Sequence, residues 1–369
     1  MSAPDLGAAI ARHIRTAGPL SLAAFMAMAL HDPERGYYAR QGPIGRAGDF
    51  VTAPEISQIF GELIGLCCAE LWQRLGRPDP VIVAELGPGR GTLMRDFLRA
   101  AEAVPGFRRA LRLHLVEASP VLRGEQMRSL AAAQPRFAAD VTALPEGPLL
   151  VVANEFLDAL PIRQLVRGSA DWAERLVGLN GRGRLAFVAG PQSPSLGLLV
   201  PPPLRGLPPG AIVEIRPAAA ALAAALADRL VRHPGAALFF DYGYFPSTAG
   251  STLAALRRHR PVGVFDSPGT ADLSAHVDFA AFAAAARAGG AAVHGPAPQA
   301  GWLAALGAEA RLAALRAAAT PHQRALLESG LGRLLDPAGM GNLFKVIALS
   351  SPGLPAPEGF AATGPAGGG

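Results

Sequence analysis

Short apolar runs alternate with amphipathic stretches through the middle of the chain. The apolar runs predict buried strands at 81–86, 111–116, 149–153 and 237–241. Stretches with apolar residues at helical spacing follow at 92–103, 120–132 and 218–232. This alternation predicts an α/β fold with a mostly parallel sheet that helices cover on both faces. Folds of this kind bind ligands at the carboxyl ends of the strands.

Two further helices are predicted before this region, at 4–16 and 21–30, with a loop at 36–49. The quartet Thr52-Ala53-Pro54-Glu55 predicts a capping box, with Thr52 as the N-cap and Glu55 reaching back to it. We therefore expect one continuous helix from this quartet to about residue 75.

The alternation is interrupted after residue 160. Strands are predicted at 162–167, 175–179, 185–188 and 212–215, with a hairpin turn at Asn180-Gly181. We interpret 162–216 as a β insertion rather than a separate folding unit. Helices at 277–288 and 302–319 and a last strand at 343–349 follow, and 351–369 carries no pattern and is expected to be a disordered tail.

Composition narrows the class of protein. The chain has 369 residues, of which 50% are hydrophobic and 17% charged, and its mean hydropathy is +0.26, which excludes global disorder. No apolar run reaches the roughly 18–20 residues of a membrane-spanning helix, so no span is expected. Cys67 and Cys68 are adjacent and the histidines lack metal-ligand spacing, so we expect no metal site and a reducing, cytoplasmic location.

The chain is basic without indicating a nucleic-acid surface. Its formal net charge is +5 and its pI about 9.8, and Lys345 is the only lysine. The arginines are scattered, and aromatic residues make up only 6% of the chain, which is poor material for stacking on bases. We therefore do not expect nucleic acid as a partner.

A glycine-rich turn follows the first predicted strand of the sheet. Glu85 ends the strand, and Gly87, Gly89 and Gly91 form a turn before the helix, where a ligand can approach the backbone closely. The spacing is neither the dinucleotide fingerprint nor a P-loop. A carboxylate here suits a ligand with an ammonium and a sulfonium group, and S-adenosyl-L-methionine carries both.

Two acidic residues extend the expected cofactor site. Glu117 ends the next strand, where its carboxylate can accept both ribose hydroxyls, although a nicotinamide dinucleotide would accept this residue too. Asp140 is placed to receive the adenine amino group, and the alternative is an aspartate that caps the turn before Val141.

The segment Asn154-Glu155-Phe156-Leu157-Asp158 ends the strand expected beside the transferred methyl group. We expect Asn154 to contact the cofactor. Guanidinium is planar and cationic, and Glu155 and Asp158 could grip its N–H groups as a fork. The alternative is the ordinary acidic preference at a helix N-terminus.

A lid over the cofactor is predicted just before the first long helix. We expect Asp49 and Phe50 to cover the ligand while Thr52 and Glu55 hold the helix that positions them, and closure would exclude water. The alternative is that these residues only shape the helix start. Farther along, Asp241, His276 and Asp278 have open roles, with a helix cap favoured for Asp278.

The ordered motifs together resemble one family. They are Gly-Tyr-Tyr at 36–38, Gly-Asp-Phe-Val-Thr-Ala-Pro-Glu-Ile-Ser-Gln at 48–58, Phe-Gly-Glu at 60–62, Glu-Leu-Gly-Pro-Gly-Arg-Gly-Thr-Leu at 85–93, and further matches at 117–120, 154–161, 241–243, 276–279 and 340–345. They resemble the MidA-type methyltransferases from about residue 20 to residue 349. Leu157 stands where the family usually has phenylalanine, and Ser274 where threonine is usual.

The resemblance implies a class I S-adenosylmethionine-dependent, Rossmann-like fold and protein arginine methylation. It implies symmetric dimethylarginine on a core subunit of respiratory complex I, in support of complex assembly, and a mitochondrial location for eukaryotic relatives. We accordingly divide the chain into a helical segment and lid at 1–54, a methyltransferase domain at 55–350 and the tail. A homodimer is left open, as are a non-catalytic cofactor-binding assembly factor and an RNA or small-molecule methyltransferase.

Overall fold

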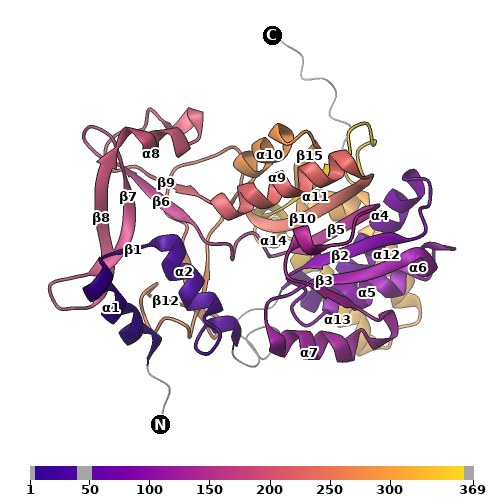
Figure 1. Ribbon diagram of the computed structural model, residues 1–369. Helices are drawn as coiled ribbons and strands as arrows, with labels where there is room; N and C mark the ends of the chain where they lie inside the picture. The colour runs from indigo at the N-terminus through magenta and orange to yellow at the C-terminus, as the bar shows by residue number, and fades with distance from the viewer. Residues whose placement is uncertain (1–4, 40–51, 361–369) are drawn as a thin grey trace. The chain divides into compact units, whose positions relative to one another are not determined.

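The computed structural model describes residues 5–39 and 52–360 of the chain, which form two compact units (Figure 1). The first unit comprises the described residues up to 39 together with 157–221 and 244–282. The second comprises 52–156, 222–243 and 283–360. The sequence-based boundary between a helical segment and lid at 1–54 and a methyltransferase domain at 55–350 stays a prediction.

The second unit is built on the predicted parallel sheet. Its strand order is β15-β16-β10-β5-β2-β3-β4. The strands β10, β5, β2, β3 and β4 pair in parallel, and β16 is antiparallel to both of its neighbours, β10 and β15. The strands are β2 Val81–Leu86, β3 Leu111–Val116, β4 Arg136–Ala138, β5 Leu149–Asn154, β10 Gly235–Tyr244, β15 Ala292–Pro298 and β16 Phe344–Ser350. The expected α/β class with a mostly parallel sheet is confirmed.

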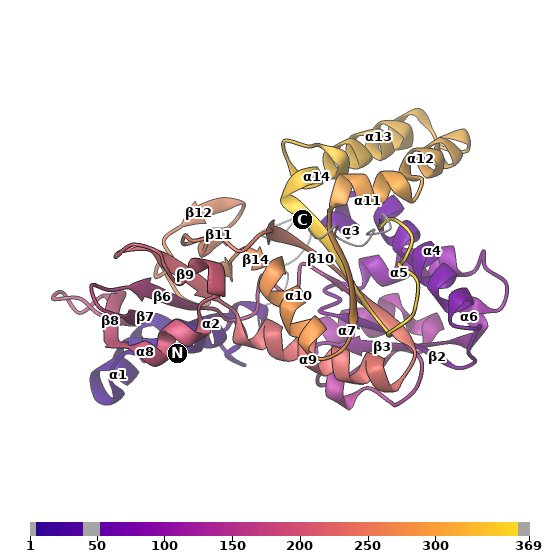
Figure 2. The ribbon, with the colours of Figure 1, turned by 90° about the horizontal axis from the view of Figure 1, so that it is seen from above.

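Helices cover this sheet. They are α3 Ala53–Ile56, α4 Gln58–Arg74, α5 Thr92–Ala101, α6 Phe107–Ala110, α7 Pro120–Ser129, α9 Pro217–Arg232, α10 Phe279–Ala288, α11 Gln299–Ala305, α12 Ala308–Ala317, α13 Pro321–Leu335 and α14 Met340–Leu343, with 3-10 turns at Ala131–Ala133 and Val141–Ala143. Figure 2 shows α11 to α14 grouped together. Phe60, Phe240 and Trp302 join α4, β10 and α11 in the core, with ring centroids 5.2 Å and 5.0 Å apart.

Two glycines set the close approach of α4 to α5. A Cβ atom on Gly61 would lie 2.9 Å from the carbonyl oxygen of Leu93, and one on Gly65 would lie 2.7 Å from that of Phe97. Since real Cβ atoms do not come so close to backbone oxygen, any larger residue would force the helices apart. This packing supports α5, the helix that begins at the glycine-rich turn.

The first unit contains a β-sheet of order β1-β7-β6-β9, with β8 paired to β7, and a small sheet of order β12-β11-β13. Its strands are β1 Leu20–Ser21, β6 Arg163–Arg167, β7 Trp172–Leu179, β8 Leu185–Ser193, β9 Ile212–Ile215, β11 Ala254–Arg257, β12 Arg260–Val262, β13 Asp272–Ser274 and β14 Val277–Asp278. Its helices are α1 Leu6–Ala17, α2 Leu22–His31 and α8 Pro194–Leu199, with 3-10 turns at Tyr37–Ala39 and Pro202–Leu204.

The predicted capping box at Thr52 is wrong. Thr52 precedes α3 but its side chain makes no capping hydrogen bond, and the carboxylate of Glu55 instead accepts a hydrogen bond from the hydroxyl of Thr92. The helix is also not continuous. Ser57 is extended, with φ −150° and ψ 129°, and its hydroxyl accepts from the N–H of Ile59 to start α4.

The predicted hairpin is confirmed, but its turn is longer than Asn180-Gly181 alone. Leu179 pairs with Leu185, and the N–H of Asn180 donates to the carbonyl of Arg184. Gly183, not Gly181, has the positive φ of 71°. The amide oxygen of Asn180 accepts from two backbone N–H groups within the loop, which stabilises the longer turn.

Several elements have no counterpart in the sequence-based prediction, among them β15, the β11–β12 hairpin and α13, and the tail was assigned wrongly in part. Residues 351–360 are not a loose tail, because Phe360 packs against Trp302 and Arg74 binds both the carbonyl of Ala356 and the carboxylate of Glu358. Residues 361–369 lie outside the described part of the chain.

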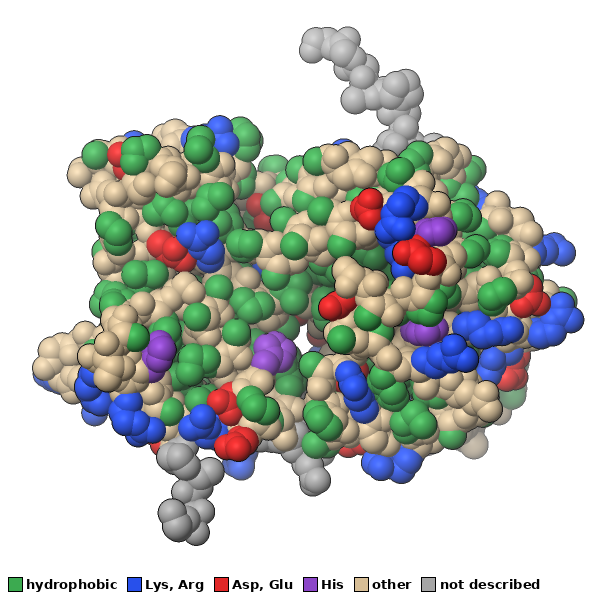
Figure 3. Space-filling view, in the orientation of Figure 1, with side chains coloured by type: hydrophobic (Ala, Val, Ile, Leu, Met, Phe, Trp, Pro, Cys, Tyr) green, Lys and Arg blue, Asp and Glu red, His purple; other side chains and the backbone are tan. Residues whose placement is uncertain are grey.

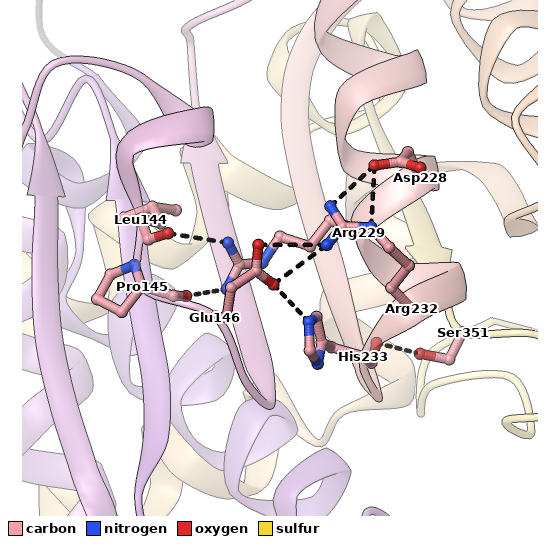
Figure 4. Close-up of polar contacts among 8 residues, drawn as sticks. All are labelled: Leu144, Pro145, Glu146, Asp228, Arg229, Arg232, His233 and Ser351. Atoms are coloured by element: carbon pink, nitrogen blue, oxygen red, sulfur yellow. Dashed lines mark hydrogen bonds and ion pairs between the residues drawn. The ribbon is translucent and has the colours of Figure 1, made fainter.

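Arg229 fixes the loop that leads into β5 (Figure 4). Its buried guanidinium donates to the carbonyls of Leu144 and Pro145. Beside it, Glu146 contacts Arg232 and His233 at the end of α9. This network holds the amino end of β5, the strand whose other end carries Asn154.

Candidate functional site

The turn after β2 has the backbone that its glycines predicted. Gly87, Gly89 and Gly91 have φ values of 62°, 54° and 78°, in the left-handed region where glycine is favoured. The N–H of Gly87 donates to the carbonyl of Val116 at the end of β3, and that of Gly91 to the carbonyl of Pro88. The turn is therefore held between two strand ends at the carboxyl edge of the sheet.

The reason for glycine at two of these positions differs from our expectation. A Cβ on Gly87 would lie 2.8 Å from the ring of Phe156, and one on Gly91 would lie 3.1 Å from Ser129 Oγ and 3.2 Å from Leu130. These glycines make room for neighbouring side chains of the protein. Binding of a ligand by the turn stays a prediction that rests on its backbone, not on open space at these two Cα atoms.

Glu85 is a buried carboxylate near the end of β2. It is 3% exposed, and no hydrogen-bond partner for its Oε2 atom occurs within residues 5–39 and 52–360. Burial, and then the nearby charge of Glu117, raise the pKa of Glu85 to about 8. A cationic group bound here would satisfy the orphaned oxygen and favour the charged form.

Glu117 lies one residue beyond the end of β3 and is 9% exposed. Its Oε1 atom accepts from the N–H of Ser119 at 2.8 Å, and its Oε2 from Nε2 of Gln126 at 3.2 Å. Burial raises the pKa of Glu117, and hydrogen bonds, led by that from Ser119, act in the opposite direction. These donors favour the ionised form that binding of ribose hydroxyls requires.

Gln126 joins Glu117 to the glycine-rich turn, and our sequence analysis missed it. Its Nε2 atom also donates to the carbonyl of Gly89 at 2.6 Å, and the side chain is fully buried in α7. A glutamine within a helical pattern carries no local signal of burial. Only the position of α7 directly after Glu117 could have drawn attention to it.

Asp140 is an exposed turn residue in this structure. Its Oδ1 atom accepts from the N–H and hydroxyl of Thr142 and from the N–H of Ala143, which caps the 3-10 turn Val141–Ala143. Hydrogen bonds from Thr142 lower the pKa of Asp140. The structural alternative is therefore present, and contact with adenine stays a prediction.

Asn154 is the last residue of β5, and Glu155 follows it; β5 pairs with β2 so that Ala153 lies opposite Leu86. Glu155 has a φ of 49°, an uncommon value for a residue other than glycine. Its Oε1 atom accepts from the N–H of Ala53 at 3.1 Å and from Nδ2 of Asn154 at 3.0 Å. Such strain persists only where the surroundings fix it, and it clusters at functional sites.

Asp158 belongs to the first unit, whereas Glu155 belongs to the second. Asp158 is 7% exposed, and its backbone carbonyl accepts from the N–H of Ala275 and from the guanidinium of Arg216. Arg216 also donates to the carbonyls of Leu160, Ala275 and His276. The turn that carries Asp158 is thus fixed within its own unit, while the fork with Glu155 stays a prediction.

The predicted lid can be followed only in part. Asp49 and Phe50 lie outside the described residues, so their proposed cover over the cofactor stays a prediction. Thr52 begins α3, and the hydrogen bond between Glu55 and Thr92 connects α3 to the first residue of α5. This contact joins the segment after the predicted lid to the helix that follows the glycine-rich turn.

The remaining candidates have structural partners. Asp278 precedes α10, and its Oδ1 accepts from the N–H of Ala281 and the hydroxyl of Ser247, as the predicted cap requires. Asp241 is 1% exposed and accepts from the N–H of Tyr242. Burial lowers the pKa of the His276 imidazole. The backbone N–H of His276 donates to Thr252 Oγ1.

Neither a metal nor a membrane is indicated in the part of the chain that the structure describes. Within it, no three histidine, cysteine, aspartate or glutamate side chains are grouped as a metal ion would require. No described helix combines the length and the apolar character needed to span a bilayer. The two buried carboxylates beside the glycine-rich turn are acceptors that could bind an organic cation and the hydroxyl groups of a sugar.

Comparison with known proteins gives the same class of ligand. A family model described as S-adenosyl-L-methionine-dependent methyltransferase matches residues 63–297. "Protein arginine methyltransferase NDUFAF7 homolog, mitochondrial" of Drosophila melanogaster is 35% identical over 368 residues, which cover 91% of this chain and 82% of that protein. The human "Protein arginine methyltransferase NDUFAF7, mitochondrial" is 32% identical and covers 91% and 81%.

A solved structure agrees in fold as well as in sequence. The COG1565 superfamily member from Burkholderia thailandensis, bound to S-adenosyl-homocysteine, has a TM-score of 0.83 and 30% identity over 96% of this chain and 93% of its own. The family resemblance stated from the motifs is confirmed, as is the mitochondrial location of eukaryotic relatives, which their names state. The family model and these relatives show that the chain belongs to the S-adenosyl-L-methionine-dependent methyltransferases.

Proposed function

We propose that this methyltransferase transfers the methyl group to an arginine side chain of a protein substrate. The names of the relatives support an arginine acceptor. The observation that carries the proposal is Glu155, a carboxylate held in a left-handed backbone conformation where β5 ends beside the turn after β2. A carboxylate in this position suits a cationic acceptor that must lie next to the bound cofactor.

The residues fit S-adenosyl-L-methionine, because Glu85 offers an unsatisfied buried oxygen to a cation and Glu117 offers an oriented carboxylate to a ribose. The cofactor supplies an electrophilic methyl group on a sulfonium sulfur. Glu85 would bind a cationic part of it, Glu117 the ribose hydroxyls, and the turn its backbone. The protein's main contribution is then to hold the nucleophile in line with the methyl carbon.

Glu155 would act on the acceptor. Accepting N–H groups of the guanidinium orients the group and concentrates its positive charge away from the nitrogen that attacks. The new carbon–nitrogen bond forms as the carbon–sulfur bond breaks, and the attacking nitrogen loses one proton to a carboxylate or to water. Asp158, in the first unit, is proposed as a second acceptor of N–H groups.

The finer predictions rest on the family resemblance. We propose a core subunit of respiratory complex I as the substrate, with symmetric dimethylarginine as the product and complex assembly as the outcome. The cytoplasmic location and a homodimer also stay predictions. On the face shown in Figure 3, several Lys and Arg side chains gather toward the right-hand edge and others lie beside acidic side chains; the protein acceptor is proposed from the names of the relatives and not from this charge.

The decisive experiment compares Glu155→Gln with the surface control Glu102→Gln. We expect Glu155→Gln to bind S-adenosyl-L-methionine with near-normal affinity in calorimetry, because the amide still accepts from Ala53, but to lose methyl transfer by about 100-fold or more. Mass spectrometry of complex I subunits incubated with each variant measures the transfer. Full activity of Glu155→Gln, or methylation of RNA alone, would contradict the proposal, and complementation by a Glu155 and Asp158 double variant would favour a non-catalytic assembly factor.

A further inference from the structure

One buried amide contacts both the carboxylate of Glu117 and the backbone of the glycine-rich turn. Gln126 lies in α7, is fully buried, and uses its Nε2 atom for two acceptors on different elements. One acceptor is the carbonyl of Gly89 in the turn after β2, at 2.6 Å, and the other is Oε2 of Glu117 after β3, at 3.2 Å. The amide therefore links the backbone of the turn to the carboxylate expected at the ribose.

These contacts leave Glu117 little freedom. The N–H of Ser119 holds Oε1 at 2.8 Å while Gln126 holds Oε2, so each oxygen has a donor and rotation of the carboxylate would break one of them. The side-chain Nε2 of Gln126 donates to carboxylate and carbonyl oxygens, and its Oε1 is buried without a partner in the described part of the chain. A buried amide oxygen without a partner is costly, so the two contacts of Nε2 must offset that cost in the folded chain.

We propose that Gln126 is a positioning residue for the nucleoside part of the cofactor: it holds the Glu117 carboxylate in one orientation and ties it to Gly89. The inference rests on the assignment of Glu117 to the ribose, and it does not depend on which acceptor is methylated. A carboxylate fixed before binding loses less conformational freedom when the ribose arrives.

The amide also bears on the charge of Glu117. Three ionisable groups matter there: Glu117 itself, Glu85 on β2, whose charge opposes ionisation, and Arg123 on α7, which favours it. The hydrogen bond from Gln126 lowers the pKa of Glu117 relative to the same site without it. Its loss should raise that pKa, so cofactor affinity should begin to fall at a higher pH on acidification.

Gln299 provides a matched control in the same unit. It too is fully buried, donates from Nε2 to one backbone carbonyl, that of Leu334, at 3.1 Å, and has an Oε1 atom without a partner in the described chain. It lies on α11, which follows β15 at the other edge of the sheet from β3. Gln299→Met therefore removes a comparable buried amide away from the two carboxylates.

The test is calorimetric binding of S-adenosylhomocysteine to the full chain between pH 5.5 and 8.5, with no acceptor present. We expect Gln126→Met to weaken binding about tenfold or more at pH 7, as loss of a hydrogen bond to a charged group implies, and to move the acid limb of the affinity profile to higher pH. Gln299→Met should leave both the affinity and the profile unchanged. In a Glu117→Gln background, Gln126→Met should have a clearly smaller effect.

A second variant tests the same inference if Gln126→Met folds poorly. In Gln126→Glu the new carboxylate opposes Glu117 when both are ionised, so affinity should fall as the pH rises from 7 to 8.5. The inference is overturned if Gln126→Met binds like the parent protein, if it loses no more affinity than Gln299→Met, or if its effect is undiminished in the Glu117→Gln background. Because no methyl transfer is measured, failure of the arginine proposal would leave this result intact.

Discussion

At the proposed cofactor site, two buried carboxylates oppose each other's ionisation, which is unfavourable when no ligand is bound. Glu85 and Glu117 are both buried, and each charge makes ionisation of the other harder. Gln126 and Ser119 relieve Glu117, whereas Glu85 keeps an oxygen without a partner among the described residues. A cation bound next to Glu85 would therefore stabilise its ionised carboxylate.

Cofactor affinity should depend on the protonation of Glu85. Its pKa is raised to about 8 by burial and by Glu117, and a bound cation would lower it, so binding near pH 7 should release a proton. We expect affinity for S-adenosyl-L-methionine to rise from pH 6 to about pH 8 and then level off. Calorimetry in two buffers of different ionisation enthalpy measures the released proton.

The variant Glu85→Gln should bind more weakly and lose proton release linked to residue 85, while Glu102→Gln on the surface should behave like the parent protein. An affinity that does not change with pH in the parent protein, with no proton released, would show that Glu85 does not meet a cation.

Local chemistry predicted some of these residues and not others. Glu85 and the glycines were found because a strand, a carboxylate and a tight turn are adjacent in the sequence. Gln126 and Arg216 were missed because their roles depend on partners in other elements, the carbonyl of Gly89 for one and those of residues 275 and 276 for the other. Neither contact leaves a mark in the local pattern.

At the scale of elements, periodicity placed the strands of the sheet well but missed α13. Its sequence contains Gly330 and Gly332, which weigh against a helix. A Cβ on Gly330 would lie 2.7 Å from the carbonyl of Ile56, so this glycine permits contact between α13 and α3. Packing between distant elements thus outweighed helix propensity, although the capping box of Thr320 and Gln323 marked the start of the helix.

The turn after β2 packs against the loop after β5, where Gly87 lies against Phe156. A substitution at Gly87 should therefore disturb this packing as well as ligand binding. Gly87→Ala places a Cβ against Phe156 and forces a residue with a side chain to adopt a φ of 62°. We expect a loss of about 1–2 kcal/mol in the free energy of unfolding together with weaker cofactor binding. Urea unfolding and calorimetry measure the two effects.

The companion substitution Phe156→Ala identifies the cause. If the new Cβ displaces the Phe156 ring, the double variant should regain part of the cofactor affinity relative to Gly87→Ala alone. Phe156→Ala should not rescue Gly91→Ala, whose Cβ meets Ser129 and Leu130. Absence of any rescue at Gly87 would favour a direct clash with the ligand.

At the scale of the whole molecule, chain segments far apart in sequence form each unit. Leu20 pairs with Val177 in the first unit, and its core joins residues of α1 and α2 to Val177 and Leu273. The N-terminal helices and the β insertion therefore share one core. The alternation of strands and helices in the sequence cannot reveal this shared core, because each segment by itself is consistent with an insertion.

Glu62 links three helices of the second unit, and the stability of the protein should reflect this at low pH. Glu62 is fully buried in α4 and accepts from Arg99 on α5, at 2.8 Å, and from Arg311 on α12, at 2.7 Å. Burial acts to raise the pKa of Glu62, but the hydrogen bonds from Arg311 and Arg99 outweigh it and lower the pKa below its usual value. A carboxyl with a lowered pKa stabilises the fold above its unfolded-state pKa and loses that contribution as the pH falls through the folded-state pKa.

We therefore expect Glu62→Gln to lower the free energy of unfolding at pH 7 by about 2 kcal/mol, less than for a fully buried pair because both arginines contact water. The difference from the parent protein should stay constant down to about pH 5 and shrink below about pH 4, where Glu62 becomes protonated as the protein unfolds. Urea unfolding followed by tryptophan fluorescence measures it, since Trp72 and Trp302 lie in this unit. Glu358→Gln, which loses an exposed pair with Arg74, should cost less than about 1 kcal/mol at every pH. A Glu62→Gln deficit that is equal at pH 7 and pH 3 would mean that packing, and not the charge of Glu62, joins α4, α5 and α12.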